Sequence, residues 1–333
     1  MRAIVVAGSG GPEQLHIEER PDPVAREGEI VVRVAGAGIN RADLLQRQGF
    51  YPPPPGASDI LGLEASGVVA GVGAGVGAGV ESVTVGDRVM LLVEGGGYAE
   101  LVAVRAAQAV RVPDNIDLIT AGGIPEVFIT AHDALFTRGH LQDGETVLIH
   151  GGGGGVGTAA IQLARQRGCR VLVTAGSAAK LERCVELGAD AGINYRSEDF
   201  VARTRELTDG GGADVVLDIM GASYLEQNLQ AVATDGRIVV IGMQGGTHAD
   251  IDLGAMLRRR ISLISTALRA RPSAQKAAIV AAFAADVVPA LAESRIRAVV
   301  DRVLPLEDAG EAHRLMEGGD VVGKIVLDAS PRA

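Results

Sequence analysis

Short apolar or alternating runs along the first part of the chain predict β-strands. Each run is bounded by Gly, Pro or Asp, as expected for strands joined by turns. One helix interrupts the strands, beginning at Asn40, and the low-complexity segment Gly71–Gly79 predicts a loop or an extended hairpin. The predicted strands are Arg2–Ala7, Glu29–Ala35, Glu64–Val72, Arg88–Val93 and Tyr98–Val104. We therefore expect a β-rich region as far as about residue 123.

From about residue 124 to residue 267, the pattern changes to strands that alternate with helices. The strand candidates carry no internal polar alternation, which predicts a parallel sheet covered by helices on both faces. These strands are Thr146–His150, Arg170–Thr174, a short one at Ile193, Ala213–Ile219, Arg237–Ile241 and Ile261–Ser265. Helices are predicted after His150 as far as Gly168, over Ser177–Leu187 and over Glu198–Thr208. We expect this region to be an α/β domain.

The last part of the chain contains two further helices and two further strands. The pattern predicts helices over Ser273–Leu291 and Pro305–Glu317, and strands over Arg297–Val303 and Val322–Leu327. These elements supply too little apolar surface for a core of their own. We therefore expect them to pack on the β-rich first domain.

The composition agrees with a soluble globular protein of two domains. A chain of 333 residues is long for one hydrophobic core, and 47% of its residues are hydrophobic while 22% are charged. The 46 glycines are dispersed without a collagen period, which suits an α/β protein with many tight turns.

Charge and hydropathy argue against several classes of partner. The formal net charge is −10 and no basic run exceeds Arg258–Arg260, so we expect no nucleic-acid partner. No stretch approaches the roughly 18 apolar residues of a membrane span, and the apolar run at the N-terminus is too short for a signal peptide. Cys169 and Cys184 form neither a disulfide framework nor a zinc site, which fits a reducing, cytoplasmic location.

The strongest local motif follows the predicted strand Thr146–His150. Gly152, Gly154 and Gly157 have the spacing G-x-G-x-x-G, directly after a strand and at the start of a helix. In this context Gly152 permits a tight turn, Gly154 lets the backbone approach a pyrophosphate, and Gly157 lets helix and strand pack closely. The helix N-terminus also favours an anion. A glycine-rich linker is the alternative, but the regular alternation of strands and helices favours a dinucleotide-binding turn.

The end of the next strand indicates NADP rather than NAD. NAD-binding domains usually carry an Asp or Glu there that binds the ribose 2′-hydroxyl. In this chain no carboxylate appears before Glu182, whereas Ser177 and Lys180 can donate hydrogen bonds to a 2′-phosphate. Ser177 could instead serve only as a helix N-cap, and Lys180 only as a solvated helix residue. These roles are compatible with phosphate binding.

With these residues identified, the chain resembles the zinc-independent quinone oxidoreductases of the medium-chain dehydrogenase/reductase superfamily, the ζ-crystallin-like group. The resemblance runs nearly from end to end. It rests on the glycine turn and on Asn40–Gly49 (NRADLLQRQG), Tyr51–Gly56 (YPPPPG), Ile60–Gly67 (ILGLEASG), Asn194-Tyr195 and Gly323–Leu327 (GKIVL). The segment Tyr51–Gly56 is most similar to the NADPH quinone oxidoreductase branch that a tumour suppressor induces in animals.

The resemblance implies a GroES-like catalytic domain over residues 1–123 and 268–333, a Rossmann domain over residues 124–267, and a cleft between them. It also implies an NADPH cofactor and a homodimer that joins Rossmann sheets edge to edge. It assigns the pyrophosphate to Gly154, Gly155, Val156 and Gly157, the 2′-phosphate to Ser177, Lys180 and Tyr195, and the nicotinamide side to the segments Ile241-Gly242-Met243 and Thr266-Ala267-Leu268. Gly154 stands where relatives often have Ser, so no role for that hydroxyl carries over.

The same resemblance predicts an enzyme without zinc. Zinc-dependent relatives hold a catalytic metal with a Cys, a histidine in a GHE motif and another Cys. Here the first of these positions matches Asn40 and the second matches Leu63, and neither side chain is a suitable zinc ligand. Hydride transfer to an acceptor that needs little polarisation remains, such as a quinone or a conjugated carbonyl compound.

Three residues of the first domain are candidates for the substrate site. Tyr51 is expected to contact or stack on a planar substrate, because four prolines hold it on a stiff, extended loop. Asn40 can orient the same substrate oxygen or the nicotinamide ribose, and Asp43 lies in the same segment. Alternatively, Asn40 is a helix N-cap and Asp43 belongs to the first helical turn. Outside this set, Glu64 is expected to be structural, His150 to end a strand, and Asp218 to orient its neighbours.

The leading hypothesis is therefore an NADPH-dependent quinone reductase that is cytoplasmic and homodimeric. An enoyl or alkenal reductase of the same superfamily differs only in the acceptor. A crystallin-like protein that binds NADPH without catalysis is the third possibility.

Overall fold

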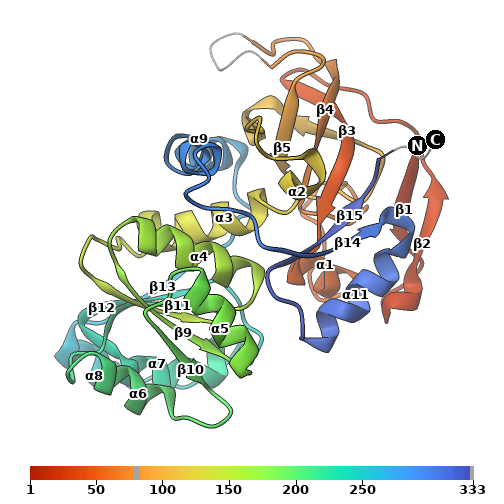
Figure 1. Ribbon diagram of the computed structural model, residues 1–333. Helices are drawn as coiled ribbons and strands as arrows, with labels where there is room; N and C mark the ends of the chain where they lie inside the picture. The colour runs from red at the N-terminus through yellow and green to blue at the C-terminus, as the bar shows by residue number, and fades with distance from the viewer. Residues whose placement is uncertain (78–82, 331–333) are drawn as a thin grey trace. The chain divides into compact units, whose positions relative to one another are not determined.

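The computed structural model describes residues 1–77 and 83–330. The chain divides into two compact units, one formed by Met1–Ile129 with Leu268–Ala333 and the other by Thr130–Ala267 (Figure 1). The second junction coincides with the one expected from the sequence. The first junction follows Ile129, whereas we expected it near residue 123.

A mixed sheet of seven strands organises the first unit. Its strands run in the order β14-β15-β3-β4-β5-β7, and β6 pairs with β3. All neighbours are antiparallel except β14 and β15. A separate pair is formed by β1 and β2. The bounds are β1 (Arg2–Val6), β2 (Leu15–Glu19), β3 (Glu29–Gly38), β4 (Glu64–Val72), β5 (Arg88–Leu92), β6 (Leu101–Arg105), β7 (Ala109–Arg111), β14 (Val300–Pro305) and β15 (Lys324–Asp328).

The C-terminal segment packs on the first unit, as expected, and it does so by completing the sheet. Strand β15 pairs antiparallel with β3, and Val326 lies opposite Gly38. The strand is buried, and its Ile325 and Leu327 belong to the core of the first unit. This is why residues far apart in the sequence share one core.

Several elements of the first unit differ from those expected. The short strands β2 and β7 were not predicted, because they carry exposed charged residues. Of the helices, α1 (Arg41–Arg47) was expected, whereas α2 (Leu118–Ala121) and α3 (Pro125–His132) were not. The predicted helix over Pro305–Glu317 begins later, as α11 (Ala309–Gly318), after a short 3-10 turn. Residues 74–77 form a turn after β4, and the rest of the low-complexity segment lies outside the described residues.

The predicted helix Ser273–Leu291 is in fact two helices, α9 (Ser273–Asp286) and α10 (Val288–Ala292). The break occurs beside Pro289, which has no N–H to continue the helical ladder. Contrary to the expectation from the sequence, the stretch Ser273–Ala292 is long and apolar enough to cross a membrane, by length and composition only. Core helices of soluble proteins meet the same criterion. In this stretch Lys276 is buried and forms an ion pair with Glu94.

The second unit contains six parallel strands in the order β10-β9-β8-β11-β12-β13. From β8, the strands β9 and β10 are added on one side. The chain then returns to β11 on the other side of β8, and β12 and β13 follow in that opposite direction. Because such crossovers are right-handed, helices cover both faces of the sheet (Figure 1). The strands are β8 (Thr146–His150), β9 (Arg170–Ala175), β10 (Ala191–Asn194), β11 (Ala213–Asp218), β12 (Val232–Val240) and β13 (Ser262–Ser265). The α/β prediction with a doubly wound sheet is confirmed.

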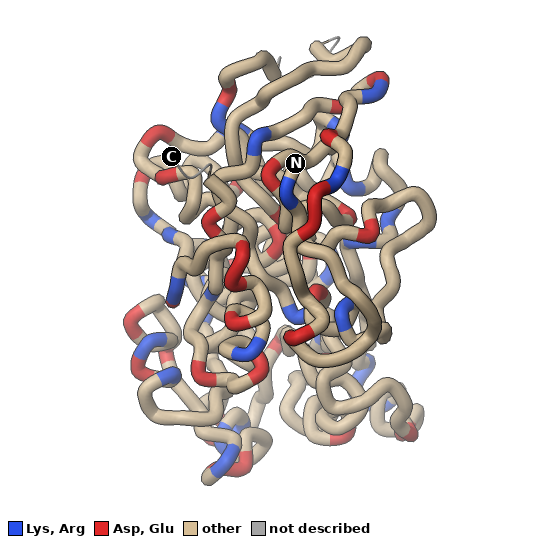
Figure 2. The backbone as a smooth tube through the Cα atoms, turned by 90° about the vertical axis from the view of Figure 1, so that its right-hand side faces the viewer, with Lys and Arg blue, Asp and Glu red and all other residues tan. Residues whose placement is uncertain are grey.

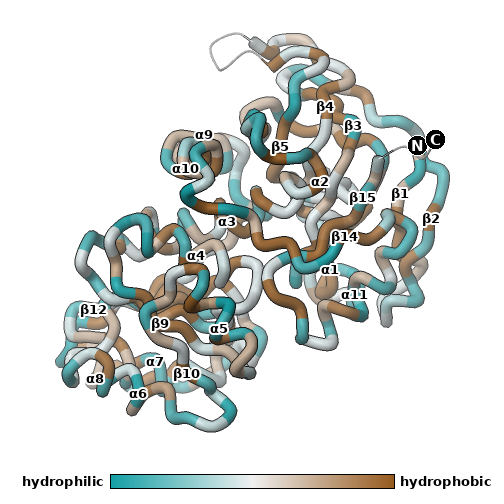
Figure 3. Tube along the Cα trace, viewed as in Figure 1, coloured by the Kyte–Doolittle hydropathy of each residue, from teal (hydrophilic) through white to brown (hydrophobic). Residues whose placement is uncertain are grey.

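The helices of the second unit are α4 (Gly155–Gln166), α5 (Ala178–Glu186), α6 (Phe200–Leu207), α7 (Leu225–Ala231) and α8 (Leu253–Arg259), with a π-helix over Asp133–Arg138. The last two α-helices and the π-helix were not predicted. Figure 3 shows β9 as hydrophobic, in contrast to the mixed helix α5. This contrast is the signal that identified the buried strands from the sequence.

Acidic and basic residues are interspersed along the described chain without an extended basic tract (Figure 2). The longest run of cations, Arg258–Arg260, is at the end of α8. Arg260 in that run forms an ion pair with Asp235. The charge pattern therefore follows the one read from the sequence.

Gly67 tests the packing of the first sheet. A Cβ atom at Gly67 would lie 1.9 Å from the carbonyl oxygen of Arg33, whereas one at Gly71 in the same strand would have its nearest contact at 3.9 Å. Gly67→Ala should therefore force β3 and β4 apart and destabilise the protein by about 1–3 kcal/mol in chemical denaturation. Gly71→Ala is the matched control and should stay within about 0.5 kcal/mol of the wild type. Equal effects of the two substitutions would contradict this account.

Candidate active site

The glycine turn connects β8 to α4 at the carboxyl end of the parallel sheet. Gly151 has a positive φ of 68°, so the left-handed position of the turn falls on Gly151 and not on Gly152, to which we attributed the tight turn. Gly152 is required for a different reason, since a Cβ there would lie 2.8 Å from Val173. A Cβ at Gly157 would lie 2.3 Å from the carbonyl oxygen of Gly151, so the close packing attributed to Gly157 is present.

The remaining residues of the turn form an open backbone surface. Gly154 is exposed, and a Cβ there would meet only the Gly151 carbonyl oxygen, at 3.4 Å. Gly155 and Val156 begin α4, whose first N–H groups have no partner within the helix. β8 and β11 are adjacent, with their connections running in opposite directions, so the turn lies at the switch point where such sheets bind ligands. Binding of a pyrophosphate at this turn stays a prediction.

The residues predicted to bind a 2′-phosphate converge around Gly176, just after β9. Ser177 is the N-cap of α5 and accepts a hydrogen bond from the Lys180 N–H at 3.4 Å. The aliphatic part of Lys180 crosses the glycine turn, because a Cβ at Gly153 would lie 3.2 Å from its Cδ atom. The Tyr195 hydroxyl lies 2.7 Å from the position of a Cβ at Gly176. No carboxylate occurs in the segment from Thr174 to Lys180.

Arg196 joins this group, although the sequence reasoning did not select it. Its Nε lies 3.1 Å from the position of a Cβ at Gly176, and its side chain is exposed. The pairing of β9 and β10, with Asn194 opposite Ala175, brings the residues after both strands together. The basic residue directly after Tyr195 was the only signal in the sequence.

The residues predicted to face the nicotinamide follow β12 and β13. Because the strands are parallel, these residues lie at the same carboxyl end of the sheet as the glycine turn. Ile241 and Gly242 are partly buried, while 61% of the Met243 surface is exposed. The Thr266 hydroxyl donates to Asp133 Oδ2 at 2.9 Å. Leu268 is buried and is the first residue of the returning first unit.

Two buried polar residues hold the loops at this edge. The Asp218 carboxylate accepts hydrogen bonds from the N–H groups of Met220, at 2.6 Å, and Gly221. It therefore orients the loop after β11, as the sequence suggested. His150 ends β8 and contacts Asn228 and Thr174 at 2.7 and 3.0 Å. Burial lowers the His150 pKa to about 4, so its ring is neutral at pH 7.

In the first unit, a buried ion pair joins β4 to β15. The Lys324 ammonium lies 2.7 Å from Glu64 Oε1, and both side chains are almost completely enclosed. The second carboxylate oxygen of Glu64 accepts the N–H of Glu126, at the start of α3, at 2.9 Å. Asn40 donates to Glu64 at 3.0 Å and accepts from Lys324 at 2.7 Å. Glu64 is therefore structural, as expected, and the Asn40 amide takes part in this network as both donor and acceptor.

Asp43 is enclosed by protein on all sides. Its carboxylate accepts from the N–H groups of Asn40 at 2.8 Å and Gly62 at 3.0 Å, and from the Tyr98 hydroxyl at 3.2 Å. Burial raises its pKa to about 6, and the two backbone hydrogen bonds oppose that shift. Asn40 is the N-cap of α1 and Asp43 lies in its first turn. This geometry fits the helix-start roles that the sequence left open for both residues.

Tyr51 lies beside Arg269, a residue that the sequence reasoning missed. The Arg269 guanidinium is 5.2 Å from the centre of the Tyr51 ring and donates to the Tyr51 carbonyl oxygen at 3.2 Å. It also donates to Gln46 Oε1 at 2.6 Å and to the Glu94 carbonyl at 2.8 Å. Arg269 thus holds the proline loop against α1. Burial raises the pKa of the partly buried Tyr51 phenol, so it remains a hydrogen-bond donor at neutral pH.

A metal site would need several side chains that can together bind the ion. Within the described chain, no group of three or more His, Cys, Asp or Glu side chains is placed to hold a metal ion. Leu63, at one of the two positions matched to zinc ligands, is 2% exposed and apolar. Asn40, at the other, is occupied by Glu64 and Lys324.

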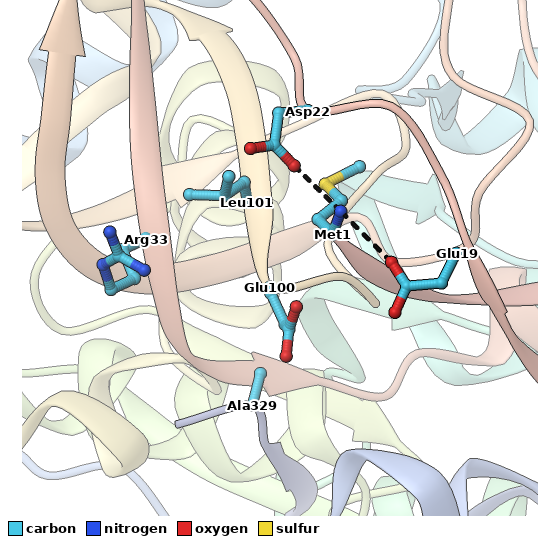
Figure 4. Close-up of a pocket in the computed structure, with 7 residues that line it drawn as sticks. All are labelled: Met1, Glu19, Asp22, Arg33, Glu100, Leu101 and Ala329. Atoms are coloured by element: carbon cyan, nitrogen blue, oxygen red, sulfur yellow. Dashed lines mark hydrogen bonds and ion pairs between the residues drawn. The ribbon is translucent and has the colours of Figure 1, made fainter. Parts of the chain in front are cut away.

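A separate pocket of about 320 Å³ in the first unit contains none of the predicted site residues (Figure 4). Its lining residues are Met1, Glu19, Asp22, Arg33, Glu100, Leu101 and Ala329. The N-terminal ammonium is 2.8 Å from Asp22 and 3.6 Å from Glu19, and Glu100 pairs with Arg2. These acidic groups are already paired, so the pocket does not compete with the candidate site.

The fold and the site can be compared with known proteins. Residues 26–114 match the alcohol dehydrogenase GroES-like domain, and residues 155–285 match the zinc-binding dehydrogenase family. The chain is 32% identical over 96% of its length to a phenolphthiocerol/phthiocerol polyketide synthase of Mycobacterium tuberculosis, but spans only 14% of that polypeptide. It is 30% identical to the human synaptic vesicle membrane protein VAT-1 homolog, over 99% of this chain and 87% of the relative.

Solved structures agree over almost the whole chain. An Escherichia coli quinone oxidoreductase complexed with NADPH has a TM-score of 0.85 and 30% identity, covering 98% of this chain and 100% of the other. An NAD-dependent alcohol dehydrogenase has a TM-score of 0.86 and 33% identity, covering 98% and 99%. The chain therefore belongs to the medium-chain dehydrogenase/reductase superfamily.

Proposed function

We propose that this protein is an NADPH-dependent, zinc-independent oxidoreductase that reduces quinones. The observation that carries the proposal is the group of donors around Gly176. Ser177, Tyr195 and Arg196 lie at the end of β9, where an NAD-binding domain would carry a carboxylate, and the Lys180 side chain crosses the neighbouring glycine turn at Gly153. Two cations and two hydroxyls at this position favour a ligand with an additional phosphate.

The residues of the second unit fit this cofactor. A Cβ at Gly152 or Gly157 would lie less than 3 Å from other atoms, so side chains are excluded there, while Gly154 leaves the backbone open. The N–H groups of Gly155, Val156 and Gly157 would bind the pyrophosphate. Ile241, Gly242, Met243 and Thr266 would line the nicotinamide side. When bound, the nicotinamide supplies a hydride, which is two electrons and one proton.

The first unit would bind and orient the acceptor. Tyr51 offers a ring for stacking and a phenol that can donate to a carbonyl oxygen, and Arg269 fixes its position. At the positions matched to zinc ligands, Leu63 has no donor atom and the Asn40 amide is already bonded. Polarisation of the acceptor therefore falls to hydrogen bonds, which suits a quinone better than an unactivated carbonyl compound.

The comparisons support the coarser part of this proposal, an oxidoreductase that uses a nicotinamide cofactor. An oxidoreductase bound to NADPH and a dehydrogenase named for NAD are similar to this chain at nearly the same level. The missing carboxylate after β9 favours NADPH. Quinone reduction is the named activity of one of them, but an enoyl or alkenal reductase remains the alternative because only the acceptor differs.

We also propose the homodimer and the cytoplasmic location expected from the sequence. Strand β13 is at the edge of its sheet, with Leu263 40% exposed, and the neighbouring α8 exposes Leu253 and Leu257. An unprotected edge strand with apolar neighbours favours pairing with a second copy.

Steady-state oxidation of NADPH with ortho-quinones, para-quinones and alkenals tests the function. We expect turnover with quinones and a strong preference for NADPH over NADH. Turnover with alkenals alone would favour the alternative reductase. Tight NADPH binding without turnover of any acceptor would favour the non-catalytic, crystallin-like protein.

Lys180 is the cation to remove first. Lys180→Ala should weaken NADPH binding about tenfold to a hundredfold, as expected for loss of a charge-assisted hydrogen bond, and change NADH binding little. Fluorescence titration of both cofactors measures this difference. Arg183→Ala on the exposed face of the same helix is the control, and Arg196→Ala should act in the same direction as Lys180→Ala. Equal losses for NADPH and NADH would refute the assigned contact.

Tyr51 tests the acceptor side. Tyr51→Ala should lower quinone turnover at least about tenfold, because ring and phenol are both lost, while the NADPH dissociation constant stays nearly constant. Tyr51→Phe separates the two contributions by keeping the ring. Phe50→Ala is the control, since Phe50 is 76% exposed. Unchanged turnover in Tyr51→Ala would show that Tyr51 does not contact the acceptor.

A further inference from the structure

Glu126 lies among the buried charges of the first unit and has no role in the cofactor site. It is the second residue of α3, and its N–H donates to Glu64. The charged and titratable groups that act on it come from other parts of the first unit: Asp43 of α1, Glu64 of β4, Lys324 of β15, Arg269 after β13, and Tyr51 of the proline loop.

The three carboxyl groups of this cluster differ in their bonding. Asp43 accepts three hydrogen bonds, and both Glu64 oxygens are bonded. The Glu126 carboxyl, by contrast, has no hydrogen bond or ion pair with any other described residue. The residue is also partly exposed to solvent. Of the three, it is therefore the carboxyl that can meet a ligand and be reprotonated by water.

The surroundings hold Glu126 in its protonated form. Burial, assisted by the negative charges of Glu64 and Asp43, raises its pKa to about 8, against the opposing effect of Lys324 and Arg269. At pH 7 the group is then a neutral carboxylic acid with a proton to give. Neighbouring groups are less suited: Asp43 has its pKa near 6 and is enclosed, and the Tyr51 phenol holds its proton more firmly than usual.

We propose that Glu126 donates the proton that completes reduction of an acceptor bound beside Tyr51. This inference rests on the proposed function. Reduction of a quinone to a hydroquinone adds one hydride, which carries both electrons, and one proton. That proton moves from the Glu126 carboxyl to the acceptor oxygen, which breaks the Glu126 O–H bond and leaves a carboxylate. Water then restores the proton, so the residue is unchanged after each cycle.

Glu126→Gln tests the inference through its effect on the pH profile. The wild-type kcat/KM for a quinone should fall as the pH rises through about 8, because the acid loses its proton there. Glu126→Gln should lower kcat/KM about a hundredfold and abolish that decline. Glu126→Asp should restore part of the rate, and Glu27→Gln, at an exposed glutamate, should behave as the wild type. NADPH affinity should be equal in all four proteins.

A second measurement is independent of turnover. NMR titration of carbon-labelled glutamate side chains, with Glu126→Gln to assign the signal, should show Glu126 protonated at pH 7 and titrating near 8. Titration near its ordinary value of 4.5 would overturn the inference.

The outcomes separate the two proposals. An active wild type whose pH profile survives in Glu126→Gln would overturn the role of Glu126 and leave the quinone reductase intact. A wild type that binds NADPH but reduces no acceptor would overturn the proposed function and the proton donor with it.

Discussion

The ion pair between Glu64 and Lys324 is the interaction on which the first unit depends. It joins β4 to β15, and through Asn40 and the Glu126 N–H it also fixes the starts of α1 and α3. Two charges buried together cost desolvation energy, so the pair stabilises only while every partner is present. Loss of one partner would leave an uncompensated charge, at a cost of about 3–5 kcal/mol. This network thus couples the end of the chain to the segment that carries the substrate candidates.

Burial is the main cause of the raised pKa of Glu126, and Glu64 of the same pair adds to it. Glu64 forms an ion pair with Lys324, and its negative charge disfavours a second carboxylate nearby. Lys324 offsets only part of this effect. Burial, together with the charge of Glu64, therefore favours an acid that retains its proton at neutral pH, and Arg269 holds Tyr51 in the same unit.

The second unit obtains its site from backbone geometry. The order of the six strands places the ends of β8, β9, β12 and β13 at one edge, and glycines allow the turn after β8 to pack against β9 and α5. The basic side chains named for this candidate site, Lys180 and Arg196, lie near Gly153 and Gly176. In the proposed site, backbone amides bind the pyrophosphate. Side chains bind the 2′-phosphate, which distinguishes NADPH from NADH.

The sequence alone determined the parts of this protein that local patterns specify. Buried strands without polar alternation, the G-x-G-x-x-G spacing and the absence of a carboxylate after β9 are all readable because they involve neighbouring residues. The break at Pro289, the short helix α3 and strand β7 were missed, since brief elements carry weak periodicity. Arg269, Lys324 and Glu126 could not be found as a group, because they are distant in sequence and meet only through the pairing of β15 with β3 and the packing of α3. Burial and charge proximity, which decide whether Glu126 keeps its proton and whether Asn40 is free, are properties of the tertiary structure alone.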